Sequence, residues 1–270
     1  MESVNTTGDF DAHTTAEPRN DGRWTTRLGS ELSGFGGTHG GYLSALGLRT
    51  MASLVTDPGR NPRSLTSHLL APVRPGAVEL LPQLERAGGS MTSTSLRIQQ
   101  DETAAALALA SFGAPRPSVR HLGVAMPDVP PPSECRPLTE KPEAEAGAGL
   151  LVEHRPARPP LPLTGGDRGE IVAWMQLLED RPVDALSAAM LADAGAPALY
   201  GRLSQYMAMP STDITIHFAD LAAATDPWVL GVFRTSHAAN GYATEDGELW
   251  TEEGRLVLQA RQLHRILQPS

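Results

Sequence analysis

Two strand-like runs, Ser64-Leu65-Thr66-Ser67-His68-Leu69-Leu70 and Asp213-Ile214-Thr215-Ile216-His217-Phe218, hold matching places in a pattern that the chain contains twice. Each run follows an apolar helical stretch, at Tyr42–Val55 in the first copy and at Pro182–Leu203 in the second. Three further β-rich segments follow each run. A helix followed by a β-meander, written twice, predicts two fused α+β units that share one core.

The spacing between the copies supports this repeat. His68 and His217 are 149 residues apart (217 − 68), and Ser111 and Gln262, near the ends of the copies, are 151 apart (262 − 111). The register is therefore nearly constant from one copy to the other.

The chain divides into four parts by composition. We expect a mobile tail over 1–22, a first unit over 23–113, a proline-rich linker over 114–148 and a second unit over 149–270. The run 103–112 is rich in alanine and leucine and also suits a helix, but the repeat favours a strand. Alternation and turn residues predict the other strands at 23–28, 77–84, 90–98, 150–154, 169–176, 228–237, 241–250 and 255–266.

Composition restricts the classes of function. The formal net charge is −9, and the sequence has no long basic run, which argues against a nucleic-acid partner. A single cysteine, Cys135, excludes an internal disulfide and a cysteine-based zinc site. The polar N-terminus is unlike a signal peptide, and no apolar run is long enough for a membrane span. We expect a cytoplasmic protein without a cofactor.

Asp193 is the first candidate for chemistry. Helical periodicity puts it beside Leu186, at the margin of an apolar face, whereas Asp184 falls on the opposite side. A carboxylate in such a position needs polar partners and can serve as a general base. The alternative is a helix-edge acid that points to water.

Ser211 and Gln262 are weaker candidates by pattern. Gln262 shares a strand face with Leu258 and Ala260, and an inward amide is costly unless its groups are hydrogen-bonded. Ser211 alternates in phase with Asp213 on a face that suits solvent. However, Ser211 is at the start of its strand, where the chain direction can still change.

The run Gly34–Gly41 contains five glycines besides Phe35, Thr38 and His39. Its spacing matches neither phosphate-binding fingerprint, but a helix N-terminus with close backbone approach can hold an anion or a polarised carbonyl. A flexible loop is the equal alternative. The eight histidines form no metal-ligand pattern, so we interpret them as structural or exposed, and no Gly-x-Ser-x-Gly elbow is present.

Four stretches together resemble the acyl-CoA thioesterase II family, over nearly the whole chain beyond the tail. They are Phe35-Gly36-Gly37, Met126-Pro127-Asp128-Val129-Pro130, Leu191-Ala192-Asp193, and the C-terminal run from Gly247-Glu248-Leu249-Trp250 to Gln262. The resemblance implies an α+β double hotdog fold, in which each of two repeats wraps an antiparallel sheet around a long helix. The Gly/His-rich start of the first helix and the run Pro156–Pro162 depart from the family pattern.

The resemblance also implies a site and a reaction. The family uses an Asp on the second helix, a Thr or Ser two residues before an Asp in the next strand, and a Gln on the last strand. Here these are Asp193, Ser211 and Gln262. The first copy has no acid between Glu31 and Asp57, so only one of the two equivalent sites should be equipped.

The implied reaction is hydrolysis of an acyl-CoA or acyl-carrier thioester. Asp193 would activate or orient a water that Ser211 and Gln262 position, while backbone N–H groups near Gly36, Gly37 and Thr38 would polarise the carbonyl.

Two other functions stay open. One is a binding module that holds an acyl-CoA or acyl carrier without hydrolysis. The other is a hotdog dehydratase or tailoring enzyme, which would need a His–Asp pair. His39 is the only histidine near a helix start, and it has no nearby acid in the sequence. Homo-oligomers, formed through sheet edges, are possible.

Overall fold

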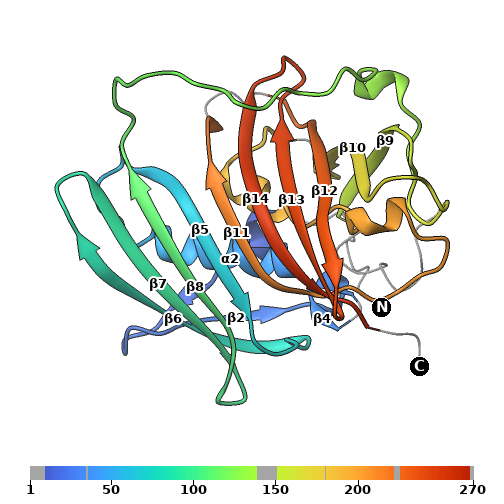
Figure 1. Cartoon of the computed structure of the whole chain (residues 1–270). Helices are drawn as coiled ribbons and strands as arrows, with labels where there is room; N and C mark the ends of the chain where they lie inside the picture. The colour runs from blue at the N-terminus through green and yellow to red at the C-terminus, as the bar shows by residue number, and fades with distance from the viewer. Residues whose placement is uncertain (1–9, 35, 139–150, 180, 222–225, 268–270) are drawn as a thin grey trace.

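The computed structural model describes residues 10–34, 36–138, 151–179, 181–221 and 226–267. Twelve strands form one antiparallel sheet in the order β1-β2-β6-β7-β8-β5-β11-β14-β13-β12-β10-β9. Figure 1 shows the strands of the first and second halves of the chain side by side, with α2 behind them. Parts of several predicted segments lie outside the described residues. These parts are 1–9 of the tail, Phe35, 139–148 of the linker and the first residue of the strand expected at 150–154.

The elements follow the predicted order closely. In the first half they are α1 (Phe10–His13), β1 (Glu17–Pro18), β2 (Trp24–Leu28), η1 (Ser30–Leu32), β3 (Ser33–Gly34), β4 (Gly37–Thr38), α2 (Gly40–Ala52), β5 (Asn61–Leu69), β6 (Gly76–Ala87), β7 (Met91–Gln100) and β8 (Thr103–Gly113). In the second half they are η2 (Pro132–Glu134), β9 (Val152–Arg158), β10 (Glu170–Leu177), α3 (Ala185–Leu191), η5 (Ala198–Gly201), β11 (Ser211–Phe218), β12 (Val229–Ala239), β13 (Tyr242–Trp250) and β14 (Leu256–Arg265). The strand expected at 103–112 is confirmed as β8.

The two halves of the sheet meet where the two quoted runs pair with each other. β5 and β11 are antiparallel, with Thr66 directly opposite Thr215 and their hydroxyl oxygens 3.2 Å apart. These threonines are 149 residues apart, the same offset that separates His68 from His217. The pairing makes the sheet continuous from one half to the other.

The main core lies between the sheet and the helices α2 and α3. Nearly all of α2 is buried, including Tyr42, Leu46 and Met51, because the helix packs against β5 to β8 on one side and α3 on another. Burial of this apolar surface is the main favourable term in folding. No helix in the described ranges is long and apolar enough to span a bilayer.

The expectation of a mobile tail over 1–22 is wrong from Phe10 onward. Phe10 is buried in the core, and its backbone N–H donates to the Glu179 carboxylate at 2.8 Å. The Tyr42 hydroxyl donates to the carbonyl of His13, and β1 pairs with β2. The polar composition of the segment hid these contacts, because Phe10 and His13 contact distant parts of the chain, whereas β1 pairs with the neighbouring β2.

The proline-rich segment after β8 crosses the top of the molecule in Figure 1; its residues 114–123 are exposed, and its later part packs on the sheet. Val124, Met126 and Val129 contact a second apolar cluster, around Trp174 and Trp250 on the sheet. The indole N–H of Trp174 donates to the Pro130 carbonyl at 2.8 Å. Prolines keep this segment out of the sheet, as predicted, but they do not keep it off the sheet's surface.

The second helix is much shorter than the predicted Pro182–Leu203. It begins after Asp184, whose carboxylate accepts hydrogen bonds from the N–H groups of Leu186 and Ser187 in a capping box. It ends at Leu191, before Gly195 and Pro197, which both disfavour continuation of a helix. Asp193 therefore lies in the turn after α3 and not inside a helix, which corrects the expectation.

The two helices approach closely at Gly41. A Cβ atom on Gly41 would come within 2.5 Å of the Met190 carbonyl oxygen and 2.9 Å of the Asp193 Cβ. Only glycine fits such a contact between two backbones. A Cβ on Gly47, also in α2, would meet only a Leu96 methyl, at 3.0 Å.

We therefore expect Gly41→Ala to destabilise the protein by about 1–3 kcal/mol through overpacking. The matched variant Gly47→Ala should be neutral or stabilising by up to about 1 kcal/mol, because alanine favours the helix and the leucine side chain can move. Denaturant unfolding of both variants measures the difference. Equal losses in the two variants would show that the helix contact at Gly41 does not limit the packing.

Candidate active site

Asp193 is buried between the two halves of the chain. Its side chain is only 8% exposed, and its Oδ2 atom accepts a hydrogen bond of 2.7 Å from the backbone N–H of Gly41. Gly41 is in the first turn of α2, where N–H groups have no partner within the helix and the helix dipole favours a negative charge. The carboxylate from the second half thus caps the helix of the first half.

Ser211 reaches the other oxygen of Asp193. Its hydroxyl lies 2.9 Å from Asp193 Oδ1, and the register of β11 against β14 shifts between Ser211 and Asp213. The shift is a bulge at Thr212, and a bulge redirects the side chains on one side of it. Ile214 and Ile216 are buried while His217 is exposed, so regular alternation holds beyond the bulge. Ser211 escapes the solvent-facing phase because of this bulge.

Gln262 lies directly behind Ser211. Its side chain is 3% exposed, its Nε2 atom donates to the Ala192 carbonyl at 2.8 Å, and its Oε1 atom lies 3.0 Å from the Ser211 hydroxyl. The predicted inward phase with Leu258 and Ala260 is confirmed by their burial. Gln262 therefore fixes both the turn that carries Asp193 and the serine that touches it.

The glycine turn lies beside the same carboxylate. Gly36, Gly37 and Thr38 line the cavity that Asp193 and Ser211 also line. The Thr38 N–H group, however, donates to the Val73 carbonyl at 2.7 Å. The expectation that this N–H group polarises a substrate carbonyl is therefore wrong. Gly37 pairs with Gly34 across β3 and β4, and a Cβ on it would meet Val73 backbone atoms at about 3 Å.

His39 is a site residue that sequence reasoning underrated. Its Nε2 atom lies 3.6 Å from Asp193 Oδ2, so a distant part of the chain supplies the acid that its sequence neighbourhood lacks. Its Nδ1 atom is buried, and among the described residues it has no hydrogen-bond partner. The only signal in the sequence was its position immediately before the glycine pair that starts α2.

A second buried pair, His264 and Glu245, lies under Ser211. His264 Nδ1 is 3.5 Å from the Ser211 hydroxyl and 3.2 Å from the Met209 carbonyl, and its Nε2 atom is 3.7 Å from Glu245 Oε1. Burial alone would lower the pKa of His264, but the Glu245 carboxylate and the charge of Asp193 outweigh it, so the pKa is raised. His264 shares the phase of Gln262, and Glu245 occupies an inward position of β13, but only the structure brings them together.

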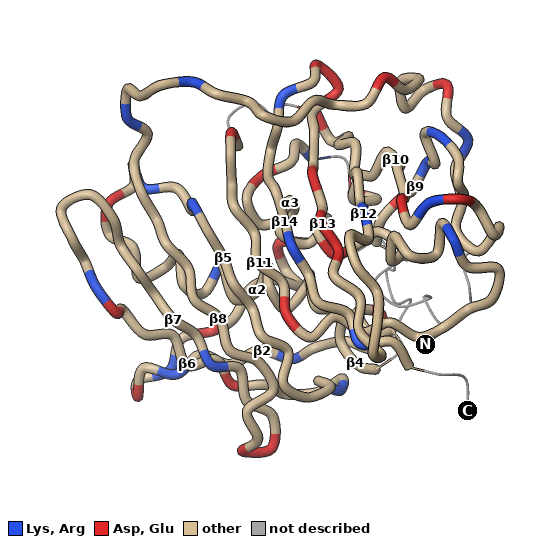
Figure 2. The backbone as a smooth tube through the Cα atoms, viewed as in Figure 1, with Lys and Arg blue, Asp and Glu red and all other residues tan. Residues whose placement is uncertain are grey.

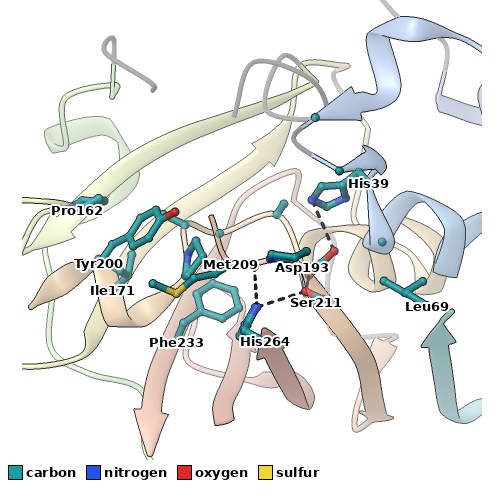
Figure 3. A pocket seen from close by; sticks show the side chains of 18 of the residues that line it. His39, Leu69, Pro162, Ile171, Asp193, Tyr200, Met209, Ser211, Phe233 and His264 are labelled. Carbon is teal, nitrogen blue, oxygen red and sulfur yellow. Dashed lines mark hydrogen bonds and ion pairs between the residues drawn. The ribbon is translucent and has the colours of Figure 1, made fainter. Parts of the chain in front are cut away.

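His39, Asp193, Ser211 and His264 line a cavity of about 440 Å³. Figure 3 shows Asp193, Ser211 and His39 at one side of it and Tyr200, Ile171, Pro162 and Phe233 extending away from them. The polar site is therefore continuous with an apolar arm, as expected for a pocket that orients one reactive group and buries an apolar tail.

Phe233 occupies a recess made by three glycines. A Cβ on Gly195, Gly231 or Gly247 would come within 2.8, 2.6 or 3.1 Å of its ring. The ring is 2% exposed and lines the cavity. Its position is consequently set by backbone on several sides.

The distribution of charged residues does not distinguish the site from the rest of the molecule. Figure 2 shows basic and acidic residues interspersed over both halves. In the residues that the structure describes, no group of three or more His, Cys, Asp or Glu side chains could hold a metal ion. The candidate site is defined by its hydrogen bonds and its cavity.

Comparison with solved structures establishes the fold. A hotdog-fold protein of unknown function from Alicyclobacillus acidocaldarius covers 98% of this chain and 100% of its own, at 25% identity and a TM-score of 0.89. An acyl-CoA thioesterase II, TesB2, from Mycobacterium marinum covers 97% and 98%, at 21% identity and a TM-score of 0.77. The dehydratase domain of RzxB from Pseudomonas fluorescens covers 96% and 98%, at 13% identity and a TM-score of 0.52. The chain has a hotdog fold.

Comparison with family models is more specific. No curated protein matches the sequence. A model of the acyl-CoA thioesterase N-terminal domain matches residues 28–113, and a model of the acyl-CoA thioesterase C-terminal domain matches residues 132–266. The chain therefore belongs to the acyl-CoA thioesterase family and is a thioester hydrolase.

Proposed function

We propose that the protein hydrolyses acyl-CoA thioesters at Asp193, with Ser211 and Gln262 as its positioning partners. The observation that carries this proposal is the Ser211 hydroxyl, which lies within 3.0 Å of both Asp193 and Gln262 at the edge of a cavity. The expected cytoplasmic location belongs to the same proposal, as does the division into a first unit at 23–113 and a second at 149–270.

The two units form a double hotdog in this proposal, with one equipped site. The antiparallel pairing of Thr66 with Thr215 at the repeat offset supports two related halves. α2 carries no acid, whereas the turn after α3 supplies Asp193. The carboxylate of the second half acts together with the helix N-terminus of the first half, which it contacts.

In the reaction, the Asp193 carboxylate takes a proton from a water molecule as the water oxygen attacks the thioester carbonyl. The tetrahedral intermediate then collapses, the C–S bond breaks, and the proton passes to the leaving sulfur. The first turn of α2 supplies the electrostatic support for the carbonyl oxygen, with Gly40 as the N–H donor next to the Asp193 contact. Gly36 and Gly37 border this position, since both line the cavity.

The acyl group occupies the apolar arm of the cavity. Ile171, Met175 and Phe233 line this arm and are buried, so an alkyl chain there would be removed from water. The CoA portion then extends from the opposite side of the cavity, past Gly36 and Pro72. Homo-oligomers through the exposed sheet edges are compatible with this arrangement.

A specific observation favours a second candidate, a dehydratase acting on 3-hydroxyacyl thioesters. His39 and Asp193 form the acid–base pair that removal of a C2 proton and protonation of the C3 hydroxyl require. This reaction releases water and leaves the thioester intact. A dehydratase domain with a similar fold supports the feasibility of this chemistry on the scaffold.

Asp193→Asn should lower thiol release from acyl-CoA by about 100-fold or more, because the amide cannot accept the proton of the attacking water. The control is Asp213→Asn, which makes the same type of substitution at a different aspartate. Asp213 lies two residues after Ser211, on the outer phase of β11. Thiol release is measured over a panel of acyl-CoAs. Near-normal turnover in a folded Asp193→Asn protein, or ligand binding by the unmodified protein without any thiol release, would contradict the proposal.

Phe233→Ala should shift the substrate preference toward longer acyl chains. Each additional buried methylene contributes about 0.8 kcal/mol, so two more should raise the long-to-short ratio of kcat/KM by roughly 15-fold. Phe233→Leu should give a smaller shift in the same direction. Phe112→Ala is the control, since Phe112 is equally buried but lies in the first half, outside the cavity lining. An unchanged chain-length profile would place the acyl group elsewhere.

His39→Gln distinguishes the two candidate functions. Under the thioesterase proposal, the variant still releases thiol and neither it nor the wild-type protein converts a 3-hydroxyacyl-CoA to the 2-enoyl-CoA. Enoyl formation is followed by its ultraviolet absorbance and thiol release by a thiol reagent. Wild-type enoyl formation that His39→Gln abolishes would support the dehydratase instead.

A further inference from the structure

The Ser211 hydroxyl has one hydrogen and two acceptors. The Ala192 carbonyl can only accept, so the Gln262 amide nitrogen, 2.8 Å away, must donate to it. The amide oxygen of Gln262 then faces Ser211 at 3.0 Å, while Asp193 Oδ1 faces the same hydroxyl at 2.9 Å. A single O–H group cannot donate fully to both, so the hydrogen must occupy one of two positions.

The protonation state of Asp193 determines which position is better. A carboxylate is the stronger acceptor, so the hydroxyl points to Asp193 when Asp193 is ionised. When Asp193 carries a proton on Oδ1, that O–H group donates to Ser211, and the Ser211 hydrogen turns to Gln262. In the second state the Asp193 proton, the Ser211 hydroxyl and the buried Gln262 oxygen each have a hydrogen-bond partner within the series Asp193–Ser211–Gln262.

We propose that the Ser211 hydroxyl turns between Asp193 and Gln262 as Asp193 loses and gains a proton, and that Gln262 stabilises protonated Asp193 through Ser211. Gln262 is a positioning residue in this arrangement, because it acts through the serine. The inference deepens the proposed hydrolysis and rests on Asp193 as the base of that reaction.

Other hydrogen-bond donors and imidazole groups also face Asp193. They are the Gly41 N–H group on α2 at 2.7 Å, His39 before α2 at 3.6 Å, and His264 on β14, which is 3.5 Å from the Ser211 hydroxyl and is offset by Glu245 on β13. A carboxylate stabilised only as an anion would be a poor base. An acceptor that becomes satisfied only when Asp193 is protonated lowers the barrier to taking the proton from water.

The same movement operates twice in one catalytic cycle. As water attacks the carbonyl carbon, its proton moves to Asp193 and the Ser211 hydrogen turns to Gln262. When the C–S bond breaks, Asp193 returns the proton to the sulfur, and the Ser211 hydrogen turns back. The net reaction consumes one water and yields an acid and a thiol, without any other reactant.

The test is the pH dependence of kcat/KM for an acyl-CoA in wild type, Gln262→Met, Ser211→Ala and the double variant. Gln262→Met removes support from the protonated form, so the acid limb should move to lower pH by about 0.5–1 unit. Ser211→Ala removes a donor from the ionised form, so the acid limb should move to higher pH. In the double variant the limb should match Ser211→Ala, because Gln262 acts only through Ser211. Gln259→Met, exposed on the same strand, is the control.

A titration without turnover covers variants that are too slow to assay. The ¹³C-carboxyl resonance of Asp193, assigned by its loss in Asp193→Asn, should titrate with the same opposite displacements in Gln262→Met and Ser211→Ala. Displacements in the same direction, no displacement, or a Gln262 effect that persists without Ser211 would overturn the inference. Absence of thiol release from wild type would instead refute the proposed hydrolysis, while the titration result would still stand.

Discussion

The hydrogen bond from the Gly41 N–H group to Asp193 is the contact on which the arrangement of the site depends. It joins the first turn of α2 to the turn after α3, across 152 residues of sequence. The bond requires two backbones to approach so closely that only glycine fits at position 41. The helix dipole and the free N–H groups of the first turn offset the cost of burying a carboxylate there.

The rest of the site consists of polar groups that must be satisfied because they are buried. Gln262 holds the Ala192 carbonyl and faces Ser211, while His264 has Glu245 as its counterion. His39 Nδ1 and His264 Nε2 are exceptions, since neither atom has a hydrogen-bond partner within the described residues, although His264 Nε2 lies 3.7 Å from Glu245 Oε1. Such a network fixes side chains to a small set of orientations, which is what a reaction with a precisely held water needs.

The hotdog fold by itself does not select a reaction. Similar folds carry a thioesterase in one relative and a dehydratase in another, at identities of 21% and 13%. The difference has to come from the groups around the buried acid. Here family membership supports thioester hydrolysis, and the apolar arm, which Phe233 lines, bounds the volume proposed for the acyl group. His39 is the group on which a distinction from a dehydratase depends.

The sequence by itself determined the strands of five or more residues, because alternation and turn residues are local signals, and the repeat identified β8 although its composition suits a helix. The two-residue strands β1, β3 and β4 were not predicted. The inward phase of Gln262 also followed from alternation with Leu258 and Ala260, and resemblance grouped it with Asp193 and Ser211. Only the tertiary structure decided where α3 ends, that Phe10 and the proline-rich segment pack on the core, and that His39, His264 and Glu245 surround the site. These features depend on contacts between residues far apart in the chain, and periodicity carries no information about which distant surfaces meet.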